Sequence, residues 1–278
     1  MTDVRFGPAG YPEGSKDTDT ALDLLNKLGL NALEYEAVYG LRVNESGARA
    51  IGEAADRHRI LMSMHAEYYI SLVSKDPQIR ARSRARLVRG LRLSPLMSVR
   101  RLVFHVGSYS GLTPEEAYPI VRDSLRSICE AIDADNKTLL CPETAGKTNA
   151  FGSLEEILRL CQDIDRCVPT IDWAHLYARN QGNLGAEDFA RVLDTFEREL
   201  GERFVNNMHF HVSGITFGDT GEREHRPMGG EWGPDVFPLV RLVVERGYSP
   251  TFISETPDPV TGAVYVKQLY HMIRESEE

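Results

Sequence analysis

Residues 100–107 read RRLVFHVG, a short apolar run that ends on a histidine, His105. Near-continuous apolar runs of this length are typical of strands in a parallel sheet that is covered on both faces. Comparable runs recur along the chain, among them TLLCPET at 138–144 and TFISETP at 251–257. Six of these runs end near a histidine, an aspartate or a glutamate, so the sequence ties the expected strands to residues that can bind a metal.

Segments with helical spacing separate the apolar runs. We expect strands near 4–9, 32–38, 60–66, 100–107, 138–144, 167–174, 208–214 and 251–257. We expect helices near 18–29, 46–58, 76–92, 114–134, 153–165, 186–200, 234–247 and 261–275. Eight strands and eight helices in strict alternation predict an α/β fold, the (β/α)8 TIM barrel. No low-complexity segment or Pro/Gly linker divides the sequence, so we expect a single domain over residues 1–278.

Composition limits the classes of function. The 32 basic and 41 acidic residues leave a formal net charge of −9, which argues against broad, nonspecific nucleic-acid binding. No apolar run reaches the roughly 20 residues of a membrane helix, and the N-terminal segment lacks the features of a secretory signal. We therefore expect a cytoplasmic protein that does not associate with membranes. The four cysteines form no C-x-x-C pair and are expected to be reduced: Cys129, Cys141, Cys161 and Cys167.

Basic residues concentrate between Lys75 and Arg101. Arg82, Arg86 and Arg89 would share one face of the expected helix at 76–92. Such a face fits either an ordinary solvated helix surface or a patch that faces phosphate groups.

The residues at the ends of the expected strands define a candidate site, because the active site of a (β/α)8 barrel lies at the carboxyl ends of its strands. Five histidines and three carboxylates belong to this set: His65, His105, Glu143, Asp172, His175, His211, His225 and Glu255. Imidazole and carboxylate ligands together suit zinc, with manganese or iron as substitutes. At about four ligands per zinc, the set is large enough for two or three ions.

The seventh unit carries two further features. His209 and His211 both lie on the expected strand at 208–214, and we expect only one of them to point into the barrel. The segment at 215–233 is Gly-rich and charged, contains His225, and is expected to be irregular. Loops of this length in compact domains are often functional.

A set of short motifs, taken in order, resembles the endonuclease IV family, the zinc-dependent apurinic/apyrimidinic endonucleases of base-excision repair. The motifs are HAEY at 65–68, HVGS at 105–108, PETAG at 142–146, IDWAH at 171–175, HVS at 211–213, His225 with Gly229, and SETP at 254–257. They span almost the whole chain. The resemblance implies a barrel that binds double-stranded DNA with abasic sites and cleaves it on the 5′ side of the lesion.

The resemblance also implies a role for each matching residue. Glu143 would bridge the first two zinc ions and position the attacking hydroxide. The remaining ligands would be His65 and His105 at the first ion, Asp172, His211 and Glu255 at the second, and His175 and His225 at the third. Tyr68 matches a tyrosine that contacts DNA. We expect such a protein to be a monomer.

This sequence departs from the family pattern in two places. The family usually has an aspartate two residues before the loop histidine, where this chain has Arg223, flanked by Glu222 and Glu224. Either glutamate would replace that aspartate after a shift of the loop. The segment after the second strand, YEAVYGLRVNES at 35–46, lacks an obvious match to the DNA-gripping loop of the family.

Two other functions remain open on the sequence. A sugar isomerase or epimerase with one metal would use Glu143, Asp172, His211 and Glu255, with two glutamates moving protons at adjacent carbons. The additional histidines have no joint role in such an enzyme. The third alternative is a barrel that binds damaged DNA without cleaving it, because Arg223 weakens the third metal position.

Overall fold

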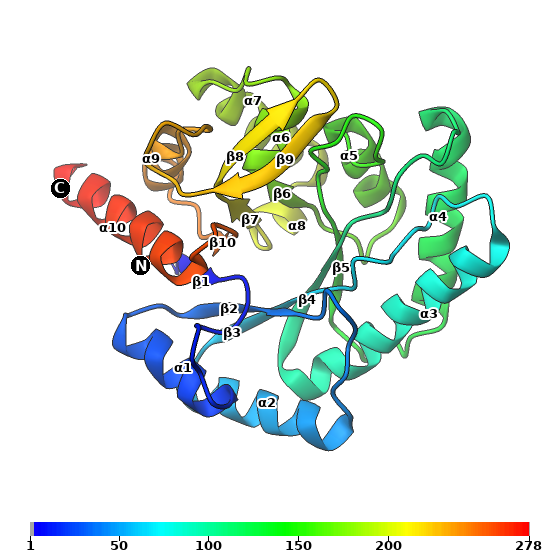
Figure 1. The fold of residues 1–278 in the computed structure, drawn as a ribbon, viewed down its shortest axis with the longest axis horizontal. Coiled ribbons are helices and arrows are strands. Elements are labelled where there is room, and N and C mark those ends of the chain that lie inside the picture. Colours follow the sequence, from blue (N-terminus) through cyan, green and yellow to red (C-terminus); the bar gives the residue numbers. More distant parts are fainter. Residues whose placement is uncertain (1–2, 278) are drawn as a thin grey trace.

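The computed structural model describes residues 3–277 and has a closed ring of parallel strands surrounded by helices (Figure 1). The ring strands are β1 (Arg5–Pro8), β2 (Ala32–Glu36), β3 (Leu61–His65), β4 (Val99–Phe104), β5 (Leu139–Pro142), β6 (Thr170–Asp172), β7 (His209–Val212) and β10 (Thr251–Ser254). The long helices are α1 (Thr18–Lys27), α2 (Glu45–His58), α3 (Pro77–Leu93), α4 (Pro114–Glu130), α5 (Leu154–Asp163), α7 (Ala186–Leu200), α9 (Phe237–Glu245) and α10 (Pro259–Glu277). The predicted (β/α)8 barrel is confirmed.

The ring consists of two four-stranded sheets that meet at two seams. One sheet has the order β1-β10-β7-β6 and the other β2-β3-β4-β5, and all their pairings are parallel. At the β1–β2 seam, Gly10 N–H donates to the carbonyl of Glu34 at 2.9 Å. A side chain at Gly7 would strike the backbone of Ala32, so glycine permits this close approach. At the β5–β6 seam, Val168 N–H donates to the carbonyl of Leu140 at 3.0 Å.

Apolar side chains fill the space between the strands and the helices, and the ring interior is more mixed. Trp173, Phe189 and Phe210 pack together in the outer layer, with ring centroids 5.0 and 5.6 Å from Trp173. Inside the ring, small apolar groups such as Val103, Cys141 and Val168 lie beside buried polar residues. Alternate residues of each strand face the interior of the ring. Each strand therefore places a short row of side chains there, and the last of them lies at the carboxyl end of the barrel.

Helix starts follow the expected local chemistry. Thr113 caps α4 ahead of Pro114, and Ser153 caps α5 with Glu156 accepting a hydrogen bond from the Ser153 N–H at 3.0 Å. Both are common helix-capping motifs. The expected boundaries differ by a few residues in several elements, for example at 167–174, where the strand shortens to β6 because the helix α6 (Trp173–Arg179) begins directly after it.

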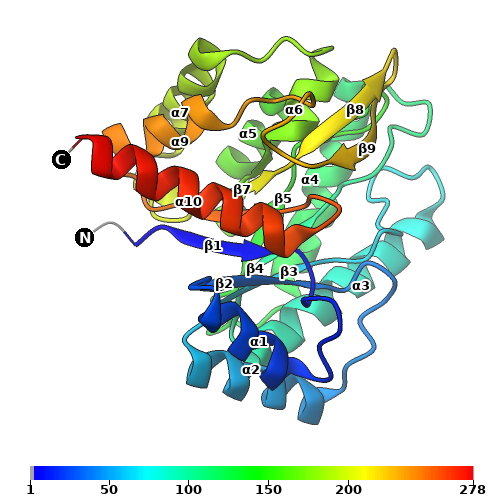
Figure 2. The same cartoon turned by 60° about the vertical axis from the view of Figure 1, so that its left-hand side comes forward.

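The prediction of an irregular segment at 215–233 is wrong in its first half. Residues there form an antiparallel hairpin of β8 (Gly214–Gly218) and β9 (Gly221–Arg226), which crosses the end of the barrel near α6 (Figure 2). Its support is tertiary, because Glu222 N–H donates to the carbonyl of Gly146 at 3.3 Å and Gly221 bridges to Lys147. Short helical segments also occur at η1 (Ser94–Met97) and α8 (Glu202–Val205).

Two other structural facts bear on the sequence predictions. The four cysteines are all free thiols. Among the described residues, no helix is both long and apolar enough to cross a membrane.

Candidate metal centre

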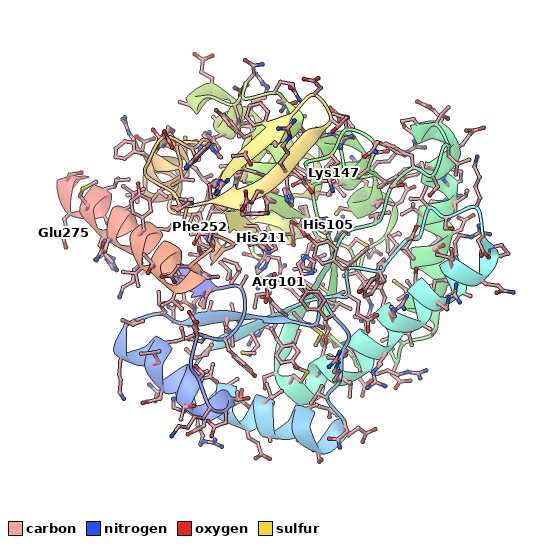
Figure 3. All side chains as sticks on the ribbon, viewed as in Figure 1. Arg101, His105, Lys147, His211, Phe252 and Glu275 are labelled. Atoms are coloured by element: carbon pink, nitrogen blue, oxygen red, sulfur yellow. The ribbon has the colours of Figure 1, made fainter. Side chains whose placement is uncertain are left out.

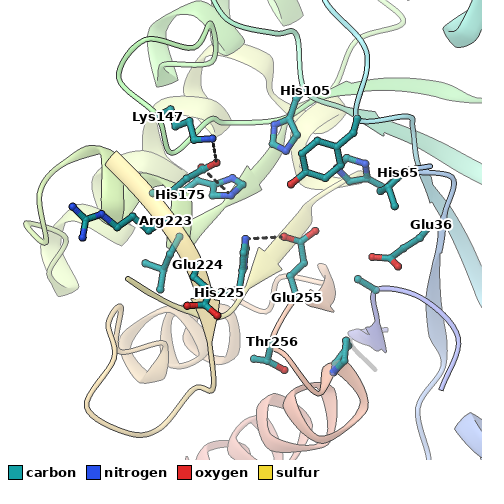
Figure 4. A pocket seen from close by; sticks show the side chains of 16 residues that line it. Glu36, His65, His105, Lys147, His175, Arg223, Glu224, His225, Glu255 and Thr256 are labelled. Atoms are coloured by element: carbon teal, nitrogen blue, oxygen red, sulfur yellow. Dashed lines mark ion pairs between the residues drawn. The ribbon is translucent and has the colours of Figure 1, made fainter. Parts of the chain in front are cut away.

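The eight predicted site residues gather at the carboxyl end of the barrel. Figure 4 shows several of them around a cavity of about 280 Å³. His65, His105 and His175 line the cavity from the side of β3, β4 and α6, while His225 and Glu255 line it from β9 and the end of β10. The structure thus brings together residues that are as much as 190 positions apart in the chain, since Glu255 follows His65 by that distance.

Glu143 lies at the centre of the cluster and is completely buried. Its Oε2 lies 3.2 Å from His65 Nε2 and 3.4 Å from His105 Nε2. Its Oε1 lies 3.2 Å from His211 Nδ1 and 3.3 Å from His175 Nδ1. The two carboxylate oxygens therefore face different sets of histidines, as a bridging ligand would require.

Asp172 and His175 are placed by one local motif. Asp172 is the N-cap of α6, and its Oδ1 accepts the backbone N–H of His175 at 2.7 Å. The cap turns both side chains toward the same side of the helix start. The second oxygen, Oδ2, is buried without a hydrogen-bond partner among the described residues. It lies 3.4 Å from His175 Nδ1, and a buried carboxylate oxygen without a hydrogen bond is costly and fits a position that faces a cation.

Ligand-type atoms at this end of the barrel form three groups, in each of which they lie within 4.8 Å of one another. The groups are His65, His105 and Glu143; then Glu143, Asp172, His211 and Glu255; then Asp172, His175 and His225. Glu143 and Asp172 each belong to two groups. The donors are imidazoles and carboxylates, a set that suits zinc and its first-row substitutes, so the residues present fit a centre with more than one ion.

Three of the histidines have an outer partner that fixes the direction of the ring. His65 Nδ1 lies 2.9 Å from the carbonyl of Ala66, and His175 Nδ1 lies 3.0 Å from the carbonyl of Thr144. A carbonyl only accepts, so each of these Nδ1 atoms carries a proton, and Nε2 is the nitrogen that could bind a metal. His225 Nδ1 lies 2.7 Å from Ser213 Oγ. Outer contacts of this type are usual for histidines that bind metals.

The close packing of these groups shifts their pKa values in the metal-free protein. Burial disfavours the charged form of His65, but its hydrogen bond to Glu143 and nearby carboxylates outweigh burial and raise the pKa to about 9. Burial raises the pKa of Asp172 to about 6, although His175 opposes the shift. Burial likewise opposes ionisation of Glu255, but His211 prevails and lowers the pKa to about 2. The carboxylates thus hold on His65 a proton that a metal would replace, whereas burial lowers the pKa of His105.

The β8–β9 hairpin, which adjoins the third ligand group, accommodates Arg223 in an irregular position of its backbone. In the hairpin, Thr216 pairs with Glu224 and Phe217 pairs with Glu222, so Arg223 is the extra residue of a β-bulge. The bulge shifts the alternation of side chains by one position. Figure 4 shows Arg223 pointing away from the histidines, and its guanidinium lies against Gly218.

Glu222 is the residue that the bulge turns toward the cluster. Its Oε2 lies 3.2 Å from His175 Nε2, and its Oε1 lies 4.0 Å from Lys147 Nζ. Glu224 instead pairs with Arg226 at 2.6 Å and is well exposed. Of the two glutamates that flank Arg223 in the sequence, Glu222 therefore occupies the position next to the third group.

Sequence reasoning missed other residues of the cavity. Glu36, at the end of β2, points into it (Figure 4), and burial together with the charge of Glu255 raises the pKa of its carboxyl. The signal was present, because Glu36 ends the second expected strand as the predicted ligands end theirs. Lys147 also lines the cavity, and its position depends on the hairpin. Tyr68 lies at the rim with 70% of its surface exposed.

The expectation that only one of His209 and His211 points into the barrel is wrong. Both are fully buried, and both rings reach the carboxylate of Glu34 inside the ring. Residues two positions apart on a strand share a face, so the same alternation that brings one histidine inward brings the other.

Part of the basic face of α3 has a structural role. Arg86 pairs with Glu67, and Arg89 donates to the carbonyls of Leu41 and Val43, both at 3.1 Å. These contacts hold the segments after β2 and β3 against the helix. Arg82 is exposed and is the member of the face that fits a phosphate contact.

Residues 22–275 match the family described as the xylose isomerase-like TIM barrel. The chain belongs to this family.

Two curated relatives have sequences similar to this chain over most of its length. The chain is 32% identical over 268 residues to an uncharacterized protein of Methanocaldococcus jannaschii, and the match covers 96% of each chain. It is 29% identical over 216 residues to a protein of Chlorobium luteolum named probable endonuclease 4, and that match covers 74% of this chain and 75% of the relative.

Solved structures with the same fold include two kinds of enzyme. Endonuclease IV from Thermus thermophilus has a TM-score of 0.73 at 22% identity, covering 98% of this chain and 99% of that one. D-psicose 3-epimerase from Clostridium cellulolyticum has a TM-score of 0.71 at 13% identity, also covering 98% and 99%. At these identities the likeness concerns the fold, so the choice between the two activities rests on the site.

Proposed function

We propose that this protein is a metal-dependent phosphodiesterase that cleaves double-stranded DNA on the 5′ side of abasic sites and leaves a 3′ hydroxyl. The observation that carries the proposal is the presence of three adjoining ligand groups that share Glu143 and Asp172. An enzyme with one metal needs only the group of Glu143, Asp172, His211 and Glu255. His65, His105, His175 and His225 are additional, and together they favour a centre with two or three ions.

The proposed ligands are divided as the groups suggest. His65, His105 and Glu143 would hold the first zinc ion, and Asp172, His211 and Glu255 would complete the second with Glu143. His175 and His225 would hold the third with Glu222, which takes the place of the usual aspartate. Manganese or iron are proposed substitutes for zinc. Ions bound there would act as Lewis acids on a phosphoryl group and neutralise charge on its oxygens.

The chain's own residues would orient the substrate. The cavity of about 280 Å³ is at the small end of the usual range for ligand sites and suits a single sugar with its phosphate. An abasic nucleotide is the least costly to turn out of a duplex. Tyr39, Tyr68 and Tyr69 are 77%, 70% and 62% exposed on the segments that follow β2 and β3. Tyr68 lines the cavity, and an exposed aromatic ring at its rim would suit stacking on a neighbouring base, so Tyr68 is the proposed DNA contact.

A DNA cleavage assay tests this function. The full chain, loaded with zinc, would be incubated with a duplex that carries one tetrahydrofuran abasic analogue, and we expect a single cut on its 5′ side. A polymerase would extend the product, because the 3′ hydroxyl is free. The absence of any cut with zinc, manganese or cobalt would contradict the proposal. We expect the chain to act as a monomer in the cytoplasm, which size measurements and cell fractionation test.

The second candidate is a sugar isomerase or epimerase, favoured by the complete four-ligand group that such an enzyme would need. It predicts one tightly bound ion per chain, whereas the nuclease predicts two or three. Elemental analysis of the purified protein separates the two. Turnover of ketohexoses without DNA cleavage would support the isomerase, and tight binding of abasic DNA by fully loaded protein without either reaction would support a non-catalytic barrel.

A further inference from the structure

A second cluster of polar side chains lies inside the barrel, directly below the ligand groups. It consists of Glu34 on β2, Ser63 on β3 and His209 on β7, which are each exposed by 3% or less. Glu36, His65 and His211 follow these residues two positions later on the same strands, so each strand contributes one residue to the lower layer and one to the upper. Figure 3 places His211 in the interior of the molecule.

Glu34 is the common acceptor of this layer. Its Oε2 accepts the hydroxyl proton of Ser63 at 2.7 Å and lies 2.9 Å from His209 Nε2. Because an ionised carboxylate only accepts hydrogen bonds, Nε2 of His209 carries the proton. These two donors hold the Glu34 carboxylate in one orientation.

The remaining oxygen of Glu34 faces a proposed metal ligand. Glu34 Oε1 lies 2.9 Å from His211 Nε2 as an ion pair, and neither atom has a hydrogen-bond partner among the described residues. On the opposite side of the same ring, His211 Nδ1 lies 3.2 Å from Glu143 and 3.1 Å from Glu255. The ring therefore connects the buried layer to the ligand groups.

His211 differs from the other oriented histidines in the charge of its outer partner. The partners of His65, His175 and His225 are two carbonyls and a hydroxyl, all neutral. A carboxylate partner makes a stronger, charge-assisted contact and raises the basicity of the nitrogen that faces the metal. Once an ion occupies the Nδ1 side in place of the proton, this partner would favour keeping the remaining proton on Nε2.

We propose that Glu34 is a positioning residue, which keeps the proton of His211 on Nε2 and so presents Nδ1 as a metal ligand. Ser63 and His209 act through Glu34 by fixing its orientation. The inference rests on the metal centre of the proposed function but not on the DNA substrate, and it holds equally for the isomerase.

The direct test is nuclear magnetic resonance of the zinc-loaded protein with 15N-labelled histidine. We expect His211 to show a protonated Nε2 with slow hydrogen exchange and an Nδ1 shifted by the metal. Glu34→Gln should move the Nε2–H resonance and speed its exchange, while the resonances of His175 stay unchanged. An Nε2–H resonance that is the same in Glu34→Gln and in the unaltered protein would overturn the proposal.

Metal affinity gives a second measurement. In a competition with a chromophoric chelator, Glu34→Gln should bind one zinc equivalent about 10 to 100 times more weakly. Ser63→Ala should have a smaller effect of the same kind, and it keeps the proposal testable if Glu34→Gln does not fold. Glu156→Gln is the matched control, because Glu156 is a buried carboxylate that accepts from Tyr109 and from the Gly152 and Ser153 amides, away from the ligands.

The outcomes also separate this inference from the proposed function. A protein that binds zinc tightly at His211 but does not cut abasic DNA would contradict the nuclease and leave the role of Glu34 intact. Equal zinc affinity in Glu34→Gln and Glu156→Gln would overturn the role of Glu34. Complete loss of one ion in Glu34→Gln, with the remaining affinities unchanged, would make Glu34 a ligand and would also overturn it.

Discussion

The upper and lower layers of the barrel interior contain the same kinds of residue in opposite situations. In the upper layer, His65, His105 and His175 lie against a cavity, and Oδ2 of Asp172 has no hydrogen-bond partner among the described residues. In the lower layer, the two oxygens of Glu34 face Ser63, His209 and His211, and none of these residues lines that cavity.

The difference shows that residue type alone does not define a metal site. Three donor side chains lie within 2.9 Å of the Glu34 oxygens, whereas several ligands of the upper layer line a cavity that can admit a cation. The lower layer can therefore act as a rigid support for the side chains of the upper layer. Four predictions test this division, and they begin with the largest expected effect.

Glu143→Gln should disrupt metal binding in the upper layer. The amide cannot bridge two ions, so we expect loss of at least one metal equivalent and a fall in abasic-site cleavage of about a thousandfold or more. Elemental analysis and a cleavage time course measure the two effects. Glu156→Gln should retain both properties, and an active Glu143→Gln variant would remove Glu143 from the centre.

Glu222→Gln and Glu224→Gln should differ although the two residues are neighbours in the hairpin. Glu222 lies 3.2 Å from His175, so its variant should lose the third ion and slow cleavage by about 10- to 100-fold. Glu224 pairs with Arg226, so its variant should bind metal as the unaltered protein does. Isothermal titration with zinc gives the count, and equal results for both variants would contradict the role of the bulge.

The metal-free protein should lose stability as the pH rises. The pKa of His65 is raised from 6.5 to about 9 in the fold, so its contribution is complete below pH 6.5 and disappears as the pH passes 9. The expected loss is on the order of 3 kcal/mol, seen as a lower unfolding midpoint at pH 9 than at pH 6.5. Zinc-loaded protein should show a flatter profile, because the imidazole then faces an ion. The same slope with and without zinc would argue against His65 as a ligand.

Arg82→Glu should have the smallest effect. If α3 contacts phosphates, affinity for abasic DNA should fall by about two- to threefold at low salt and much less at high salt. Arg198→Glu, an exposed change on α7, is the control. Fluorescence anisotropy over a range of salt concentrations measures the affinity. Equal behaviour of the two variants would make the α3 face an ordinary solvated surface.

Much of the site could be predicted because barrel geometry is regular. The carboxyl ends of parallel strands meet at one edge, so the residues at those ends converge wherever the strands are found. The same rule would have pointed to Glu36, which ends the second strand. The two-residue alternation of a strand likewise places His209 on the same inner face as His211.

The position of Glu222 could not be predicted in the same way. It depends on a bulge at Arg223 and on contacts of the hairpin with Gly146 and Lys147, which lie about 75 residues earlier in the chain. Long-range support of this kind leaves no local signal, because the segment itself has no regular apolar alternation. The burial of Glu34 could not be predicted from the sequence either, because nothing in the run ALEYE indicates that three donors surround its carboxylate.

The order of apolar runs and helical segments was enough to specify an eight-unit barrel, and the residues that end the runs were enough to specify a ring of metal ligands. Both follow from periodicities of the chain, which are local. The direction of each imidazole, the choice of Glu222 over Glu224 and the separation of a buried layer from one that lines a cavity depend on atoms brought together from distant segments. Only packing in three dimensions establishes which donors are already paired, and that pairing distinguishes the proposed metal centre from the buried layer that positions it.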